Sequence, residues 1–279
     1  MTQSAKTRAV GKWSLFTIAL ILSLILMLPF FYMVFCSLQP DNLTVISGEF
    51  FPKAFQLRNY LDAVKEIKMF DLLKNTLVVV VGNLTLVTIS TLIIAYGFAR
   101  FDGVGKNVLF YIVMSTMMLP WVVTLVPSYV IFDRLGWVNT FLPLIIPAIG
   151  GSAFYIFMMR QFFMNIPRDL DEAATIDGCN SFMILFRILL PQMKPAIATM
   201  LILSFNGVWS DYIGPNLYLQ KPALHTLSIG LNYFKSMSGG SMPWHIVMAA
   251  CTLFSLPMAL VMFFAQDAFT RGIVTSGLK

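Results

Sequence analysis

Residues 164–194 read MNIPRDLDEAATIDGCNSFMILFRILLPQMK and separate two long apolar runs. Pro167 followed by acids at 169, 171 and 172 predicts the start of a short helix, because the positive end of the helix dipole favours acidic side chains. Gly178 predicts the end of this helix, since glycine readily adopts the left-handed conformation of a C-cap. Ser181 is expected to cap a second helix that ends at Pro191. The stretch therefore predicts a compact knob of two short helices, suited to docking into a partner's groove.

The apolar runs on either side indicate a membrane protein. The chain of 279 residues is 58% apolar and 11% charged, against about 25% charged in an ordinary soluble domain. A helix needs about 20 apolar residues to cross the hydrocarbon core. Five charge-free stretches are long enough. A sixth stretch has Asp211 as its single charged residue and predicts a shorter span. They are 13–40, 75–99, 107–132, 135–159 and 236–266, with 195–220 as the sixth. We expect an all-α membrane protein with a six-transmembrane-helix bundle.

The distribution of basic residues predicts the orientation of this bundle. With six spans, both termini and the 164–194 knob share one side, which carries eleven lysines and arginines against six acids. The opposite side carries eight basic residues against seven acids. The positive-inside rule therefore predicts cytoplasmic termini and a multi-pass protein of a cytoplasmic membrane. The net charge of +6 favours contact with the lipid bilayer over nucleic acid, since the basic residues are scattered.

The knob carries a family resemblance. Glu172-Ala173-Ala174, Gly178, Ile188 and Leu190-Pro191 have the spacing of the EAA signature (EAA-x3-G-x9-I-x-L-P). This pattern resembles the membrane subunits of binding-protein-dependent ABC importers. The flanking sequence resembles the carbohydrate-uptake branch, similar to the second membrane subunit of the maltose permease, and the resemblance runs from about residue 14 to the end. The flanking motifs are Leu57–Tyr60, Ala95–Phe101, Met118–Pro120 and Trp209–Tyr212.

The resemblance implies a type I ABC importer permease with a bacterial location. It places a cytoplasmic tail at 1–12, the permease domain at 13–266 and a second cytoplasmic tail at 267–279, with residues 164–194, here called the EAA segment, as the coupling element. The implied partners are a second homologous permease subunit in a heterodimer, two ABC ATPase subunits, an extracytoplasmic solute-binding protein and a carbohydrate substrate. The implied ATPase-coupling residues are Glu172, Ala173, Ala174, Asp177, Gly178, Leu190 and Pro191.

A phosphate-binding loop is missing from the sequence. Residues 103–107, Gly-Val-Gly-Lys-Asn, are the nearest approach to the G-x-x-x-x-G-K-[ST] pattern and lack both its first glycine and its final hydroxyl residue. We therefore expect no cofactor on this chain and no enzymatic activity. ATP and Mg²⁺ are expected to be used by the partner ATPase subunits.

Polar and aromatic residues of the later spans are candidates for the substrate pathway: Asn83, Asn206, Trp209, Asp211 and Tyr212. Hydrogen bonding between helices and core packing are equally open for the asparagines and the tryptophan, and a position at the outer interface is open for Asp211. The stretch 216–242 is expected to be a long outer loop. In it Tyr218, Tyr233 and Phe234 are candidates for contact with the binding protein, against the alternative of a solvated loop.

An ion-coupled secondary carrier or a channel for a small polar solute is the alternative function. Proton or sodium coupling normally requires ionisable groups within the spans. Five of the six predicted spans have none, and a self-sufficient carrier has no evident use for the knob. The sequence therefore favours the importer permease, without naming the sugar.

Overall fold

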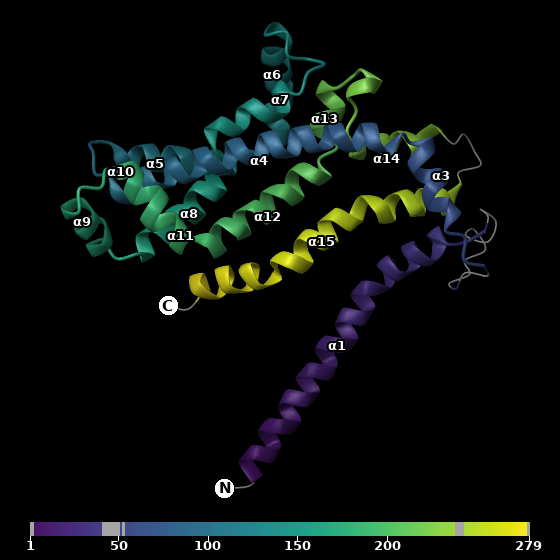
Figure 1. The fold of residues 1–279 in the computed structure, drawn as a ribbon, viewed down its shortest axis with the longest axis horizontal. Helices are drawn as coiled ribbons and strands as arrows, with labels where there is room; N and C mark the ends of the chain where they lie inside the picture. Colours follow the sequence, from purple (N-terminus) through teal and green to yellow (C-terminus); the bar gives the residue numbers. More distant parts are fainter. Residues whose placement is uncertain (1–2, 41–50, 52–53, 238–242, 278–279) are drawn as a thin grey trace. The chain divides into compact units, whose positions relative to one another are not determined.

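The computed structural model describes residues 3–40, 51, 54–237 and 243–277, and the regular elements in these ranges are all helices (Figure 1). The predicted all-α class is confirmed. The longer elements are α1 (Gln3–Ser37), α3 (Arg58–Glu66), α4 (Met69–Arg100), α5 (Lys106–Ser115), α6 (Trp121–Arg134), α8 (Ala153–Asn165), α9 (Asp169–Ile176), α12 (Lys194–Ser210), α14 (Leu227–Met237) and α15 (Trp244–Gly277). The shorter ones are η1 (Thr116–Met118), α7 (Leu142–Ile145), η2 (Ile146–Gly150), α10 (Ser181–Met183), the π-helix η3 (Ile184–Leu189), α11 (Leu190–Gln192), α13 (Ile213–Tyr218) and η4 (Pro222–Leu224).

Within the described ranges, four helical stretches are long and apolar enough to cross a membrane. They are Trp13–Ser37, Met69–Arg100, Leu142–Asn165 and Trp244–Gln266. Two pairs of helices reach that length only when each pair is taken together, and both pairs are sharply bent. Lys106–Met118 and Trp121–Arg134 meet at 99°, and Ser181–Gln192 and Lys194–Ser210 meet at 83°. The described residues thus contain up to six candidate spans when each bent pair counts as one.

The first bend divides the predicted span over 107–132 into two helices. Leu119 is extended, with ψ 115°, and Pro120 follows with ψ 127° as the N-cap of α6. The ring of a proline clashes with helical backbone at the preceding residue, so the chain leaves the helix at Leu119. Pro127 lies inside α6 and does not end it. Of the two prolines, only Pro120 therefore breaks the span.

The second bend corrects the extent of the predicted sixth span at 195–220. α12 ends at Ser210, and Asp211 is already extended, with ψ 121°. The helical residues that complete this apolar stretch lie before α12, in Ser181–Gln192. The residues after Asp211 form a separate unit of short helices.

The predicted tails continue the terminal helices. α1 begins at Gln3, and α15 runs on through Asp267 to Gly277. Residues 1–2 and 278–279 of these tails lie outside the described residues.

The chain divides into two compact units. The first comprises Met1–Met69 and Leu231–Leu256, and the second Phe70–Gly230 and Pro257–Lys279. In the first unit, Nδ2 of buried Asn59 in α3 donates to the carbonyls of Ser37 and Gln39, both at 2.8 Å. The hydroxyls of Ser37 and Tyr60 lie 2.6 Å apart. These bonds attach α3 to the end of α1.

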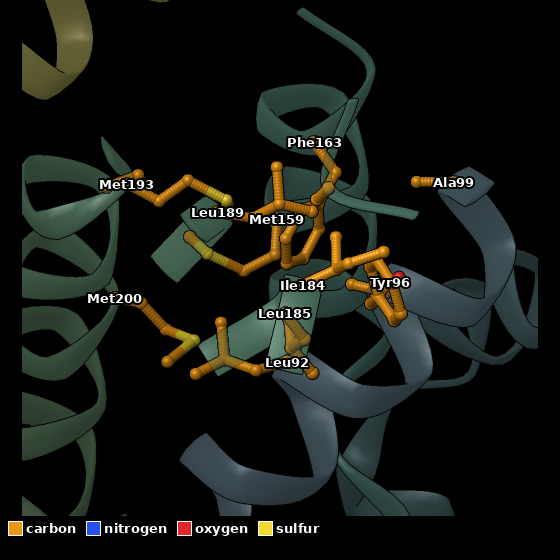
Figure 2. Packing of buried hydrophobic residues seen from close by; sticks show 13 residues of the cluster. Leu92, Tyr96, Ala99, Met159, Phe163, Ile184, Leu185, Leu189, Met193 and Met200 are labelled. Carbon is orange, nitrogen blue, oxygen red and sulfur yellow. The ribbon is translucent and has the colours of Figure 1, made fainter. Parts of the chain in front are cut away.

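A buried apolar cluster organises the second unit (Figure 2). α4, α8, α9, η3 and α12 all contribute side chains to it, so it joins two long helices to the short helices of the EAA segment. Its members are Leu92, Ala95, Tyr96, Ala99, Met159, Phe163, Ala174, Ile184, Leu185, Leu189, Met193, Ala196 and Met200. Burying these side chains fixes the position of the EAA segment relative to α4.

The predicted outer loop at 216–242 is largely helical in its described part. It contains the end of α13, η4 and the whole of α14. Residues 238–242, which include most of its serine- and glycine-rich stretch, lie outside the described residues. The prediction of a long loop is therefore wrong for residues 216–237, which are largely helical.

Candidate functional site

The first helix of the EAA segment begins and ends as predicted. α9 has Asp169, Asp171 and Glu172 in its first turn. Gly178 has a φ of +82°, the left-handed conformation that favours glycine. The amide of Gly178 donates to the carbonyl of Thr175, and that of Cys179 donates to the carbonyl of Ala174 at 2.9 Å. This pair of bonds is the Schellman motif, which satisfies the last carbonyls of a helix.

The two alanines of the EAA signature have different surroundings. Ala174 is buried in the apolar cluster, whereas Ala173 is exposed. Leu190 is also partly buried against the cluster, while Pro191 is exposed. In this structure Ala174 and Leu190 therefore help to attach the EAA segment to the rest of the protein.

The opposite face of α9 is open. Glu172, Ala173, Asp177 and Gly178 are all exposed. Ile176 is 87% exposed, an unusual position for a branched apolar side chain. Charged and apolar groups thus lie together on one accessible surface.

The second half of the EAA segment differs in its start and end from the prediction. Asn180, rather than Ser181, is the N-cap, and its Oδ1 accepts from the amide of Met183 at 2.9 Å. Pro191 lies within the first turn of α11 and does not end the helical run. In the first turn of a helix a backbone N–H has no partner within the helix, so a proline there costs no hydrogen bond. Phe182 is 66% exposed, and Phe186 is also exposed. Sequence reasoning missed these two rings and Ile176, although apolar residues between polar ones were a visible signal.

An ion pair ties α9 to the end of α4. Nε of Arg100 lies 2.8 Å from Oδ2 of Asp171, with the two side chains only 7% and 19% exposed. The atoms are close as an ion pair without being aligned as a hydrogen bond. Nη2 of Arg100 also donates to the carbonyl of Ile166 at 3.0 Å. One guanidinium therefore holds both sides of the α8–α9 turn.

An exposed set of charges lies in the neighbouring α4–α5 turn. Oδ1 of Asp102 accepts from Nζ of Lys106 at 2.9 Å, and Oδ2 lies 3.8 Å from Nη1 of Arg168. The hydrogen bond from Lys106, followed by the positive charges of Lys106 and Arg168, lowers the pKa of Asp102 below its ordinary value. The carboxylate is therefore ionised throughout the physiological pH range.

Two of the predicted pathway residues have packing roles. Nδ2 of Asn83 in α4 donates to the carbonyl of Leu144 at 2.8 Å, within the stretch broken by Pro143 and Pro147. Trp209 is 3% exposed and stacks on Phe205, with ring centroids 5.4 Å apart. In this structure Asn83 joins α4 to α7 and Trp209 is packed in the interior, which favours the alternative that the sequence left open for them.

Asn206 remains exposed on α12, where its carbonyl and side-chain oxygen both accept from the hydroxyl of Ser210. Tyr212 is half-buried and precedes α13. Asp211 lies directly after α12, and its Oδ1 accepts from the amide of Gly214 at 3.1 Å. Its carbonyl accepts from the hydroxyl of Ser228 at 2.6 Å. Asp211 therefore shapes the turn between α12 and α13.

The candidate binding-protein contacts are not equivalent. Tyr218 is 5% exposed, stacks on Tyr129 and meets Phe132 edge-on. Its ring is thus part of the packing and offers little surface to a partner in this structure. Tyr233 is exposed and Phe234 half-buried, both on α14.

Asn139, in the α6–α7 turn, binds residues 211–230, here called the 211–230 segment. It has a φ of +62°, and its Oδ1 accepts from the amides of Gln220 and Lys221 at 2.8 and 2.9 Å. Its own amide donates to the carbonyl of Tyr218 at 2.8 Å. The sequence analysis did not single out Asn139 as a structural residue, because its partners lie some eighty residues further along the chain.

The membrane-length apolar helices, together with an anchored EAA segment that exposes charged and apolar side chains, are typical of a membrane transport protein. Residues 87–275 match the family model described as the binding-protein-dependent transport system inner membrane component. The chain belongs to this family. It is the membrane-embedded permease component of an ABC importer, and it is not itself an enzyme.

Similar proteins extend the match to nearly the whole chain. The arabinooligosaccharides transport system permease protein AraQ of Bacillus subtilis (strain 168) is 30% identical, covering 96% of this chain and 98% of that protein. The polygalacturonan/rhamnogalacturonan transport system permease protein YtcP of the same organism is 31% identical, covering 93% and 95%. A chain from the crystal structure of a bacterial ABC transporter involved in import of the acidic polysaccharide alginate has a TM-score of 0.81 at 22% identity, covering 96% and 99%. The latter likeness establishes the shared fold.

Proposed function

We propose that this chain passes a carbohydrate, of oligosaccharide size, across a bacterial cytoplasmic membrane. The observation that carries the proposal is the near full-length similarity to AraQ and YtcP, whose names refer to oligosaccharides and pectic polysaccharides. Specificity is expected to be shared with an extracytoplasmic binding protein and with a second, homologous permease subunit that completes the translocation path.

The exposed face of α9 is the proposed docking surface for one of two ATPase subunits. Glu172 and Asp177 supply charge, and Ile176 supplies an apolar group that is exposed in the isolated chain. Desolvated apolar groups surrounded by polar contacts carry much of the energy of an interface. ATP and Mg²⁺ act in the partner subunits, whose closure reaches the membrane bundle through the EAA segment.

This proposal includes an orientation. The EAA segment and both termini are cytoplasmic, and the 211–230 segment and α14 lie on the outer side. Tyr233 and Phe234 of α14 are proposed contacts of the binding protein, and Asn206, Asp211 and Tyr212 remain the proposed pathway residues. A cysteine at Asp133 should then react with a membrane-impermeant thiol reagent from the outside, and one at Ile176 only after the membrane is opened.

The test of function is purification of the intact complex and identification of its chains, followed by a sugar screen against its binding protein. Oligosaccharides that bind should stimulate ATP hydrolysis and accumulate in proteoliposomes. The chain purified alone should neither hydrolyse ATP nor concentrate sugar. Accumulation by the lone chain under an imposed proton or sodium gradient would contradict the proposal, as would a complex that responds only to ligands other than carbohydrates.

A further inference from the structure

α4 differs from the other spans in its freedom from proline. It runs 32 residues from Met69 to Arg100 without one, which at 1.5 Å per residue is about 48 Å. Each of the other five spans contains at least one proline: Pro29, Pro120, Pro143, Pro191 and Pro257 are examples. Proline removes a backbone hydrogen bond and allows a helix to bend. α4 is therefore the stiffest span of the chain.

One end of α4 is tied to the 211–230 segment. Nδ2 of Asn75 donates to the carbonyls of Ala223 and His225, both at 2.9 Å. Oγ1 of Thr76 accepts from the amide of Leu227 at 2.8 Å. Leu72 packs so closely on Gly230 that a Cβ there would lie 2.1 Å from its Cδ1. The polar bonds reach backbone atoms, so they fix the path of this segment and not merely one side chain.

The other end of α4 is tied to the EAA segment, whose α9 and α10 lie beside it (Figure 1). Arg100 holds Asp171 and the carbonyl of Ile166, as described above. Nε of Arg160 in α8 donates to the carbonyl of Phe98 at 3.3 Å, and its guanidinium lies 4.3 Å from the ring centre of Phe110. The last turn of α4 is thus held by charged groups on both sides of the α8–α9 turn.

We propose that Arg100 and Asn75 are positioning residues at opposite ends of one rigid helix, and that α4 couples the ATPase-docking surface of α9 to the outer 211–230 segment. The inference rests on the proposed function, because that function assigns the two ends to opposite sides of the membrane. Movement of α9 on ATPase closure displaces α4 along its length, and the polar bonds of Asn75 pass the displacement to residues 223–227. Coupling of this kind acts in both directions, since linkage between two binding events is reciprocal.

The test uses the complete complex, with its sister subunit, ATPases and binding protein, in proteoliposomes. ATP hydrolysis is measured with and without the loaded binding protein for Arg100→Gln, for Asn75→Ala and for the double variant. Arg100→Lys keeps the charge but replaces the planar fork that reaches both Asp171 and Ile166. Lys106→Gln and Lys74→Ala are the matched controls, because they remove the half-buried Lys106 and the exposed Lys74 near the same two ends of α4.

Each single variant should lose stimulation by the loaded binding protein about fivefold or more, the lower range of allosteric coupling, while the basal rate stays at the parent level. Arg100→Lys should be intermediate, and the controls should match the parent. Residues that act in series through one helix give non-additive losses. The double variant should therefore lose no more stimulation than the more impaired of the two single variants.

Three results would overturn the coupling role. They are unchanged stimulation in both single variants, basal and stimulated rates that fall in the same proportion, and losses that multiply in the double variant. If Arg100→Gln does not assemble, the same comparison of single and double variants is made with Arg100→Lys and Asn75→Ser. A parent complex that lacks ATPase subunits or ignores its binding protein refutes the proposed function itself, a result distinct from a working parent with indifferent variants.

Discussion

The EAA segment and the 211–230 segment are both short helical pieces next to α12, yet different forces hold them. The EAA segment is attached chiefly by a buried apolar cluster, with one shielded ion pair. The 211–230 segment is held by side chains that bond to backbone atoms, from Asn75, Thr76 and Asn139. The first arrangement depends on many apolar side chains from α4, α8, α9, η3 and α12. The second depends on single polar residues elsewhere in the chain.

This difference matters for the transport cycle. Apolar packing is non-directional. The EAA segment can therefore transmit force from a partner without depending on particular hydrogen bonds. Hydrogen bonds to backbone atoms are directional and are lost when geometry changes. We therefore expect the EAA segment to move as a solid piece and the 211–230 segment to switch between bonded and released arrangements.

The largest effect is expected on the docking surface of the EAA segment. Glu172→Lys should leave assembly of the membrane subunits intact, because the side chain is exposed, and should reduce uptake about 100-fold or more. Placing like charges in an interface costs several kcal/mol, and 1.4 kcal/mol is a factor of ten. Uptake of labelled sugar into proteoliposomes measures the loss. Asp133→Lys, a charge reversal at an exposed position in the last turn of α6, is the control. Wild-type uptake with Glu172→Lys would remove Glu172 from the docking surface.

Two phenylalanines separate the attachment of the EAA segment from its docking surface. Phe163 is fully buried in the apolar cluster, and Phe182 is largely exposed. Phe163→Ala should lower the free energy of unfolding by about 3–5 kcal/mol, measured by denaturant titration in mixed micelles. Phe182→Ala should leave that free energy unchanged and weaken binding of the ATPase subunit. Equal destabilisation by both substitutions would contradict the distinction between the buried cluster, which Phe163 of α8 joins, and the exposed surface of the EAA segment, where Phe182 of α10 lies.

The close contact between α4 and the 211–230 segment can be tested with two glycines. A Cβ on Gly230 would meet Leu72 of α4. A Cβ on Gly97, which lies within α4, would meet no atom within 4 Å. Gly230→Ala should destabilise the protein by about 1–3 kcal/mol through overpacking, and Gly97→Ala should not. Thermal unfolding in detergent gives the comparison. A neutral Gly230→Ala would mean that this contact relaxes without cost.

A smaller effect is expected where Asn139 clamps the 211–230 segment. Asn139→Ala removes the acceptor for two amides and places an alanine at a φ of +62°, which should cost about 1–2 kcal/mol. Asn139→Gly removes the acceptor but relieves the backbone, so it should cost less. Hydrogen exchange at Gln220 and Lys221 reports the clamp directly, and unchanged exchange in both variants would show that the segment is held by other contacts.

The smallest effect is expected at Asp102. Its pKa is lowered in the folded protein by Lys106 and then Arg168, so the ionised form is favoured by folding. The resulting stabilisation is present above the ordinary pKa of the group and is lost as the pH falls through its lowered value. Asp102→Asn, which resembles the protonated form, should lack this small stabilisation at neutral pH and match the parent at acid pH, so its stability–pH curve should be flatter. A parent and variant with the same acid profile would show that these surface charges do not contribute.

The sequence allowed prediction of the features that arise from local chemistry. The six apolar stretches, the start of α9 and the left-handed Gly178 follow from charge spacing and capping. The burial of Ala174 but not Ala173 depends on which face of α9 meets the cluster. The prolines are visible in the sequence. Whether the span bends at Leu119–Pro120 depends also on how the surrounding helices pack. Asn83, Asn139 and Trp209 form contacts set by the tertiary fold, and their residue types alone do not reveal whether they face a substrate or a neighbouring helix.

Ionic strength should act unequally on the two sets of charges at the end of α4. The screening length falls from about 8 Å at physiological salt to about 3 Å at 1 M, and it weakens exposed pairs much more than shielded ones. Asp102 is 77% exposed on its side chain, whereas Arg100 and Asp171 are nearly sealed from water. A cell that concentrates its cytoplasmic salt under osmotic stress would therefore loosen the α4–α5 turn while α9 stays fastened to α4. The ion pair that positions the proposed ATPase-docking surface would therefore persist at high salt.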